Sequence, residues 1–140
     1  MGMVHAEITL INVKDEEFAK AGYIKIGEIR SVTVTATADS GSMYLVITEE
    51  IFRKLGLDVK GEKIAHCANG QRVKCKLTSP VNIIWKDRDI SLPAVVVPGA
   101  EKVLLGALAL EGMDLMINPV TQELVGVHGD KVEIYTLKAS

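Results

Sequence analysis

Alternating hydrophobic and polar positions, a pattern typical of half-buried β-strands, recur along this chain. The clearest case is residues 32–38, where Val and Ala alternate with three Thr residues. Because successive side chains of a strand point to opposite faces, this segment predicts one aliphatic face and one Thr face. The charged residues 15–21 interrupt the pattern, and no element is predicted there. Further short strands are expected at residues 6–13, 23–26, 44–47, 81–85, 90–97, 103–106, 115–117, 124–127 and 132–137.

Two short helices are expected among these strands. Thr48 can cap the first, and Gly56 is placed to end it after Leu55. Acidic residues in its first turn and basic residues in its last turn suit the helix dipole. The second helix is expected at residues 107–112, which are mostly small and aliphatic.

The dipeptide Asn69-Gly70 predicts a β-hairpin between residues 62–68 and 71–77, because Asn-Gly favours a two-residue hairpin turn. A two-residue loop sets a register that puts the two cysteines, Cys67 and Cys75, on opposite faces and well apart along the ribbon. We therefore expect no disulfide between them.

Composition limits the classes of function. The chain has 140 residues, 48% of them hydrophobic and 24% charged, with a formal net charge of −2. These values predict one globular domain spanning residues 1–140. Six aromatic residues and a slightly acidic charge give little support for nucleic-acid binding. The N-terminus does not resemble a signal peptide, and the longest apolar run, residues 103–110, is too short to span a membrane, so we expect a cytoplasmic protein without membrane contact.

Asp39 is the most promising candidate for chemistry. The three His residues are scattered without a metal-ligand spacing, and no phosphate-binding Gly motif occurs. Asp39 follows the alternating strand and opens an Asp-Ser-Gly turn. Such a tripeptide arises by chance in roughly one chain in fifteen of this length. A purely structural carboxylate that accepts hydrogen bonds from the following backbone N–H groups is the competing interpretation.

The order of segments around Asp39 resembles that of the retropepsin-like aspartic proteases, in particular the single-domain bacterial and archaeal kind. The alternating strand enters Asp39-Ser40-Gly41-Ser42, and Leu45-Val46-Ile47 and the first helix follow. The predicted hairpin, Leu104-Leu105-Gly106, a short helix and residues 114–119 come later, so the resemblance covers residues 8–127. It implies an all-β fold: a closed or partly open acid-protease-like β-barrel with one or two short helices, which is half of a pepsin-like architecture.

The resemblance implies an aspartic endopeptidase that acts on a peptide or protein and needs no metal or other cofactor. In such chemistry two carboxylates about 3 Å apart share one proton, so that one acts as base and the other as acid. Residues 104–107 carry no second Asp. The second carboxylate must then come from a second copy, and we expect a homodimer in which the two Asp39 residues form the pair.

The resemblance also assigns supporting roles. The hydroxyl of Ser40 would brace the two active-site loops across the dimer, while Gly41 and Ser42 would support the catalytic loop. A flap that closes over bound peptide is expected at the tip of the hairpin, at Ala68, Asn69 and Gly70. Leu105 and Gly106 would pack behind the catalytic loop beside the substrate groove. Residues 6–13 and 132–137 are candidate dimer strands.

Two alternatives remain open at this point. The fold could serve as a peptide-binding or dimerisation module with little or no hydrolysis, because one fold hosts several functions. In the other alternative, the chain is an unrelated small β-barrel in which Asp-Ser-Gly occurs by chance, and Asp39 would then lie far from its symmetry mate.

Overall fold

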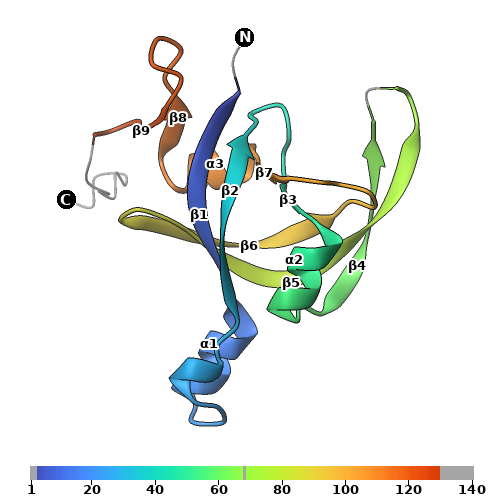
Figure 1. The fold of residues 1–140 in the computed structure, drawn as a ribbon, viewed down its shortest axis with the longest axis vertical. Coiled ribbons are helices and arrows are strands. Elements are labelled where there is room, and N and C mark those ends of the chain that lie inside the picture. Colours follow the sequence, from blue (N-terminus) through green and yellow to red (C-terminus); the bar gives the residue numbers. More distant parts are fainter. Residues whose placement is uncertain (1–2, 68, 130–140) are drawn as a thin grey trace, which may run out of the picture.

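The computed structural model describes residues 3–67 and 69–129 of the chain (Figure 1). Over these ranges we find nine β-strands, three α-helices and one short 3-10 helix. In chain order they are β1 (Val4–Asn12), α1 (Val13–Lys20), η1 (Ile26–Glu28), β2 (Ser31–Ala38), β3 (Leu45–Ile47), α2 (Glu49–Leu55), β4 (Val59–His66), β5 (Arg72–Trp85), β6 (Arg88–Val96), β7 (Val103–Leu105), α3 (Ala107–Gly112), β8 (Leu115–Ile117) and β9 (Leu124–Gly126). The strand expected at residues 132–137 lies outside the described residues.

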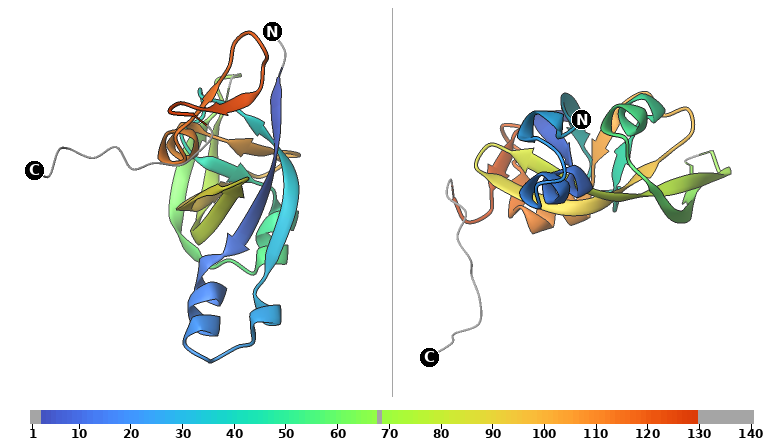
Figure 2. Two further views of the ribbon diagram at one scale, coloured as in Figure 1. Left: turned by 90° about the vertical axis from the view of Figure 1, so that its left-hand side faces the viewer. Right: turned by 90° about the horizontal axis from the view of Figure 1, so that it is seen from below.

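Six of the described strands close into a barrel, in the order β1-β2-β7-β3-β6-β5, with β5 pairing back onto β1. The pairs β2–β7 and β3–β6 are parallel, and the other pairs in the barrel are antiparallel. β4 extends the barrel as the outer strand of a hairpin with β5, whereas β8 and β9 form a separate small hairpin (Figures 1 and 2). The prediction of an all-β barrel is confirmed, and the barrel is closed.

Aliphatic side chains fill the barrel, as the scarcity of aromatic residues requires. Leu10, Leu45, Ile47 and Leu105 are completely inaccessible to solvent. β2 follows its predicted alternation, because its Val and Ala residues are buried or half-buried and Thr33 and Thr35 are exposed. Thr37 differs: it is also buried, at the end of β2 that pairs with both β1 and β7.

The segment between β1 and β2 differs from the expectation. Residues 13–20 form α1, capped by the Asn12 side chain, which accepts a hydrogen bond from the N–H of Asp15. The strand expected at residues 23–26 is wrong. Tyr23 and Ile26 are 79% and 82% exposed, and no strand among residues 3–67 and 69–129 pairs with this segment. This segment protrudes from the end of the barrel opposite the β2–β3 loop (Figure 1).

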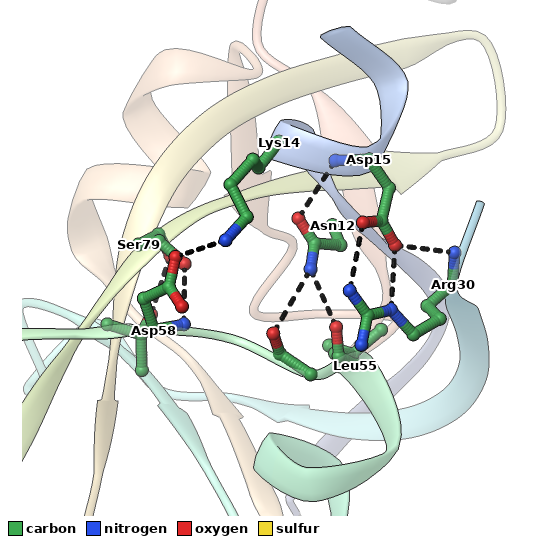
Figure 3. A network of polar contacts seen from close by, with 9 residues as sticks. Asn12, Lys14, Asp15, Arg30, Leu55, Asp58 and Ser79 are labelled. Carbon is green, nitrogen blue, oxygen red and sulfur yellow. Dashed lines mark hydrogen bonds and ion pairs between the residues drawn. The ribbon is translucent and has the colours of Figure 1, made fainter. Parts of the chain in front are cut away.

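A polar network ties this protruding segment to the barrel (Figure 3). The buried Asn12 side chain donates to the carbonyl of Leu55 at 2.7 Å. The carboxylate of Asp15 accepts three hydrogen bonds from Arg30, one from its backbone N–H and two from its guanidinium, at 2.8–3.0 Å. These bonds lower the pKa of the Asp15 carboxyl. The ammonium of Lys14 forms an ion pair with Asp58 and lowers the pKa of the Asp58 carboxyl.

Both expected helices are present. Thr48 caps α2 by accepting a hydrogen bond from the N–H of Ile51, and Gly56 ends it in the left-handed conformation with a φ of 60°. α3 covers residues 107–112, as expected from its small and aliphatic residues.

The β4–β5 hairpin is present, but its predicted register is wrong by one residue. His66 pairs with Arg72, and the N–H of Cys67 donates to the carbonyl of Gln71, so the loop has three residues. Gly70 takes a φ of 84°, the left-handed position that such a loop requires at its end. In this register Cys67 and Cys75 share one face, contrary to the expectation; both are nevertheless free thiols.

The strands expected at residues 71–77 and 81–85 are one continuous strand, β5. An irregularity in its pairing with β6 falls between Leu77 and Pro80, where Pro80 lies opposite Pro93. Proline has no backbone N–H that could donate a hydrogen bond to a neighbouring strand. The two prolines therefore fit the place where the β5–β6 register shifts.

Candidate active site

Asp39 stands at the carboxyl end of β2, where the chain turns towards β3. Its backbone N–H donates to the carbonyl of Leu105 at 2.9 Å and continues the parallel pairing of β2 with β7. Residues 39–44, which we call the Asp39 loop, therefore begin at a fixed point on the barrel. Leu105 is completely buried directly behind that point.

The amino end of α3 holds the far side of the Asp39 loop. The N–H groups of Ala107 and Leu108 donate to the carbonyls of Ser42 and Met43, at 2.7 and 3.1 Å. Gly106 makes this approach possible: a Cβ built on it would lie 2.5 and 2.6 Å from the backbone carbonyl oxygens of Tyr44 and Ser42. Leu105 and Gly106 thus lie against the Asp39 loop. The sequence did not predict that these two N–H groups bind the Asp39 loop. A Gly directly before a short helix is the sequence signal that could have indicated so close an approach.

The carboxylate of Asp39 is exposed and held at one oxygen. The N–H of Gly41 donates to Oδ1 at 2.9 Å, and the N–H of Ser42 donates to the backbone carbonyl of Asp39 at 3.1 Å. In the part of the chain that the structure describes, no Lys, Arg or His forms an ion pair with Asp39, and Oδ2 has no hydrogen-bond partner. One carboxylate oxygen is therefore positioned by the backbone and the other is available to a water, a substrate or a second carboxyl.

The two serines of the loop lie in different surroundings. The hydroxyl of Ser42 donates to the carbonyl of Tyr44 at 3.2 Å and so helps to close the turn. Ser40 is exposed, and its hydroxyl has no partner within residues 3–67 and 69–129. Ser42 therefore stabilises the loop from within, whereas Ser40 presents a donor at the surface.

Three depressions border the Asp39 loop, and one of them, of about 270 Å³, lies between Ser40, α3 and β8. Another, of about 540 Å³, contains Asp39 and Ser40 and is bounded by β1, the end of β2, Leu104 and Ile117. The third, of about 270 Å³, lies between residues 42–46 and residues 63–66 of β4. A further depression, of about 680 Å³, lies between β2, α2 and residues 99–103 and contains none of the predicted site residues.

The tip of the β4–β5 hairpin rises at the same end of the barrel as the Asp39 loop (Figure 1). Asn69 and Gly70 are exposed there, and the Asn69 side chain accepts a hydrogen bond from the N–H of Gln71 at 3.0 Å. Ala68, the third residue predicted for the flap, lies outside the described residues.

Neither a metal centre nor a membrane helix is found in the described ranges. No three His, Cys, Asp or Glu side chains there lie close enough together to hold a metal ion. No helix there is long and apolar enough to cross a bilayer.

An Asp-Ser-Gly loop thus stands on a closed six-stranded barrel and is held from behind by the short strand β7 and the helix α3. Residues 24–109, more than half of the chain, match the model of the aspartyl protease family, and the chain belongs to that family. The match includes Asp39, the β4–β5 hairpin and Leu105-Gly106.

Two solved structures are similar to this chain at low identity. A retropepsin-like aspartic protease from Rickettsia conorii is 18% identical over 84% of this chain and 88% of its own, with a TM-score of 0.49. The EIAV protease complexed with the inhibitor HBY-793 is 22% identical over 56% of this chain and 75% of its own, with a TM-score of 0.47. No curated protein matches the sequence significantly.

Proposed function

We propose that this protein is an aspartic endopeptidase that works as a homodimer, with Asp39 of each chain forming the catalytic pair. The observation that carries the proposal is the exposed Asp39 carboxylate on a backbone-anchored loop, in a chain that belongs to the aspartyl protease family. A single domain of 140 residues then supplies half of an active site, and two copies supply all of it.

The chemistry requires two adjacent carboxyl groups that share one proton. The ionised carboxylate takes a proton from a water, which attacks the carbonyl carbon of the peptide bond. The protonated carboxyl donates to the carbonyl oxygen, which gives a tetrahedral intermediate with two hydroxyl groups. The first carboxyl then passes the proton it took from water to the nitrogen, the C–N bond breaks, and the second carboxylate takes a proton from one of the hydroxyl groups, so that the pair again shares one proton. The Gly41 N–H bond to Oδ1 supports this role because it fixes the carboxylate before substrate arrives.

A second copy is needed because no other carboxyl group in the described residues bonds to Asp39. The free hydroxyl of Ser40 suits a hydrogen bond to the partner loop, and a residue beside a two-fold axis meets its own copy. β1 can contribute only in part to a dimer sheet. Residues 9–11 already pair with both β2 and β5, whereas residues 4–8 pair with β2 alone.

The β4–β5 hairpin is the proposed flap. Its tip lies at the same end of the barrel as the Asp39 loop, and β4 lines the depression beside residues 42–46. Closure of Asn69 and Gly70 over a bound peptide would exclude water from the reacting atoms.

The substitution Asp39→Asn tests the proposal because it removes the carboxylate at nearly constant volume. We expect an unchanged dimer by sedimentation and a fall of at least about 10³-fold in peptide cleavage, in the range of lost acid–base catalysis. Asp89→Asn, at an exposed position on β6, is the matched control and should cleave like the wild type. Cleavage by the Asp39→Asn variant at the wild-type rate would refute the catalytic role.

Binding of a transition-state analogue separates a protease from a peptide-binding module. A peptide with a hydroxyl in place of the scissile carbonyl should bind the wild type far more tightly than the matching plain peptide. Equal affinities, together with no cleavage, would favour the binding module.

A further inference from the structure

The depression of about 270 Å³ between the Asp39 loop and β4 has mostly apolar walls and a basic rim. Its apolar lining comes from both sides and from the end of β6: Met43, Tyr44, Val46, Ile64, Ala65, Val95 and Val97. Lys63 and His66 of β4 contribute the ionisable groups, and no acidic residue lines it. A cavity of this kind suits a side chain with an apolar stem and a negatively charged end.

Lys63 is held at this rim without a carboxylate partner. Its ammonium lies 5.7 Å from the centre of the Tyr44 ring, a distance at which the ring face attracts a cation. Elsewhere on the hairpin, Lys74 pairs with Glu62 and Lys76 with Glu49, but no ion pair involves Lys63 in the described ranges. The charge of Lys63 is thus positioned yet not neutralised.

The surrounding hairpin is basic in an acidic chain. Residues 59–77 contain five Lys or Arg residues and one Glu, a net charge of +4, so the remainder of the chain carries −6. The positive potential is therefore concentrated on the element that would cover a bound peptide. Such a distribution attracts negatively charged segments and repels positively charged ones.

We propose that the depression between residues 42–46 and β4 is a subsite for an acidic substrate side chain, with Lys63 as its specificity-determining residue. A Glu side chain fits best, because its two methylene groups can pack on the walls at Tyr44 and Val46 while its carboxylate meets the Lys63 ammonium. The inference rests on the proposed peptidase function and adds the substrate class, a peptide with an acidic residue beside the scissile bond.

Matched peptides that differ only by Glu or Gln at one position, moved stepwise across the scissile bond, test the subsite. At one position we expect Glu to raise kcat/KM about fivefold over Gln at low salt, the size of a partly exposed ion pair. The preference should shrink at high salt because exposed charges are screened. Equal kcat/KM for Glu and Gln at every position would overturn the proposal.

Charge reversal at Lys63 assigns the preference to this residue. Lys63→Glu should invert the Glu-to-Gln ratio, and Lys63→Gln should bring it close to one. Lys60→Glu makes the same charge change on the same strand outside the depression and should leave the ratio as in the wild type. An unchanged ratio in both Lys63 variants, or an inverted ratio in the Lys60 variant, would show that Lys63 does not select the substrate.

A binding measurement keeps failure of the subsite distinct from failure of the proposed function. If no peptide is cleaved, the proposed peptidase function fails, and fluorescently labelled Glu and Gln peptides are titrated into the wild-type protein. Tighter binding of a Glu peptide, lost in Lys63→Gln, would still support the acidic subsite. Equal affinities would overturn it.

Discussion

Gly106→Ala should destabilise the Asp39 loop through backbone contacts alone. The added methyl group would lie 2.5 Å from the carbonyl oxygen of Tyr44 and 2.6 Å from that of Ser42. These are backbone atoms, so no side-chain rotation can relieve the overlap. The φ of −89° at Gly106 is ordinary for any residue, and the whole effect therefore comes from the lost space.

The expected loss in the free energy of unfolding follows from the contacts that must break or shift. Separating the loop from α3 breaks the hydrogen bonds from Ala107 to Ser42 and from Leu108 to Met43, at about 1 kcal/mol each. Overpacking of the surrounding backbone adds about 1–3 kcal/mol. Alanine restricts the unfolded chain and recovers up to about 1 kcal/mol. We expect a net loss of about 3 kcal/mol in the free energy of unfolding.

Urea denaturation at one fixed protein concentration measures this loss, because the stability of the proposed dimer would depend on concentration. Gly27→Ala is the control, since a Cβ there has no atom within 4 Å and the φ of Gly27 is not positive. Peptide cleavage should fall in Gly106→Ala and stay unchanged in Gly27→Ala. A loss below about 1 kcal/mol with full cleavage by Gly106→Ala would refute the view that this contact holds the loop.

Two further predictions concern the barrel away from the loop. Asp15→Asn should cost about 2 kcal/mol at pH 7, because Arg30 loses its charged acceptor. Since the pKa of folded Asp15 lies below its ordinary value of 3.8, its contribution is complete above that value and disappears as the pH falls through the folded pKa. Urea titrations of wild type and variant should therefore converge in acid, and a constant difference down to pH 2 would contradict the ion pair as the cause. Thr48→Ala should cost about 1 kcal/mol by thermal unfolding through loss of the α2 cap, whereas Thr48→Ser should cost less; equal losses would show that the hydroxyl does not matter.

Local sequence patterns were sufficient to predict an element when the whole pattern lies within that element and its ends. The alternation of residues 32–38 predicted β2 and, apart from Thr37, its two faces, and the cap at Thr48 and the stop at Gly56 predicted α2. Asp-Ser-Gly after that strand, combined with the order of later segments, was sufficient to indicate the aspartyl protease family. The predictions of β2 and α2 depend on spacing within about ten residues, whereas the family resemblance also uses the order of segments over residues 8–127.

Sequence patterns failed to predict the local structure where contacts with residues distant in the sequence determine it. Residues 13–20 carry few apolar side chains, so no helical pattern was visible, and α1 is stabilised by Asn12, Asp15 and Arg30 across the chain. Asn69-Gly70 favoured a turn but did not fix its length, and pairing along β4 and β5 selected a three-residue loop.

The sequence by itself determined most of the strands, the helices α2 and α3, and which carboxylate is the candidate for chemistry. Only the tertiary structure decided what lies beside that carboxylate. Parallel pairing of β2 with β7 brings residues 105–108 against the Asp39 loop, more than sixty residues away in sequence. The alternation of side chains in a short apolar strand predicts which face is buried, but not which strand it pairs with. Closure of the barrel selects the pairing, because it buries the inner faces of all its strands together.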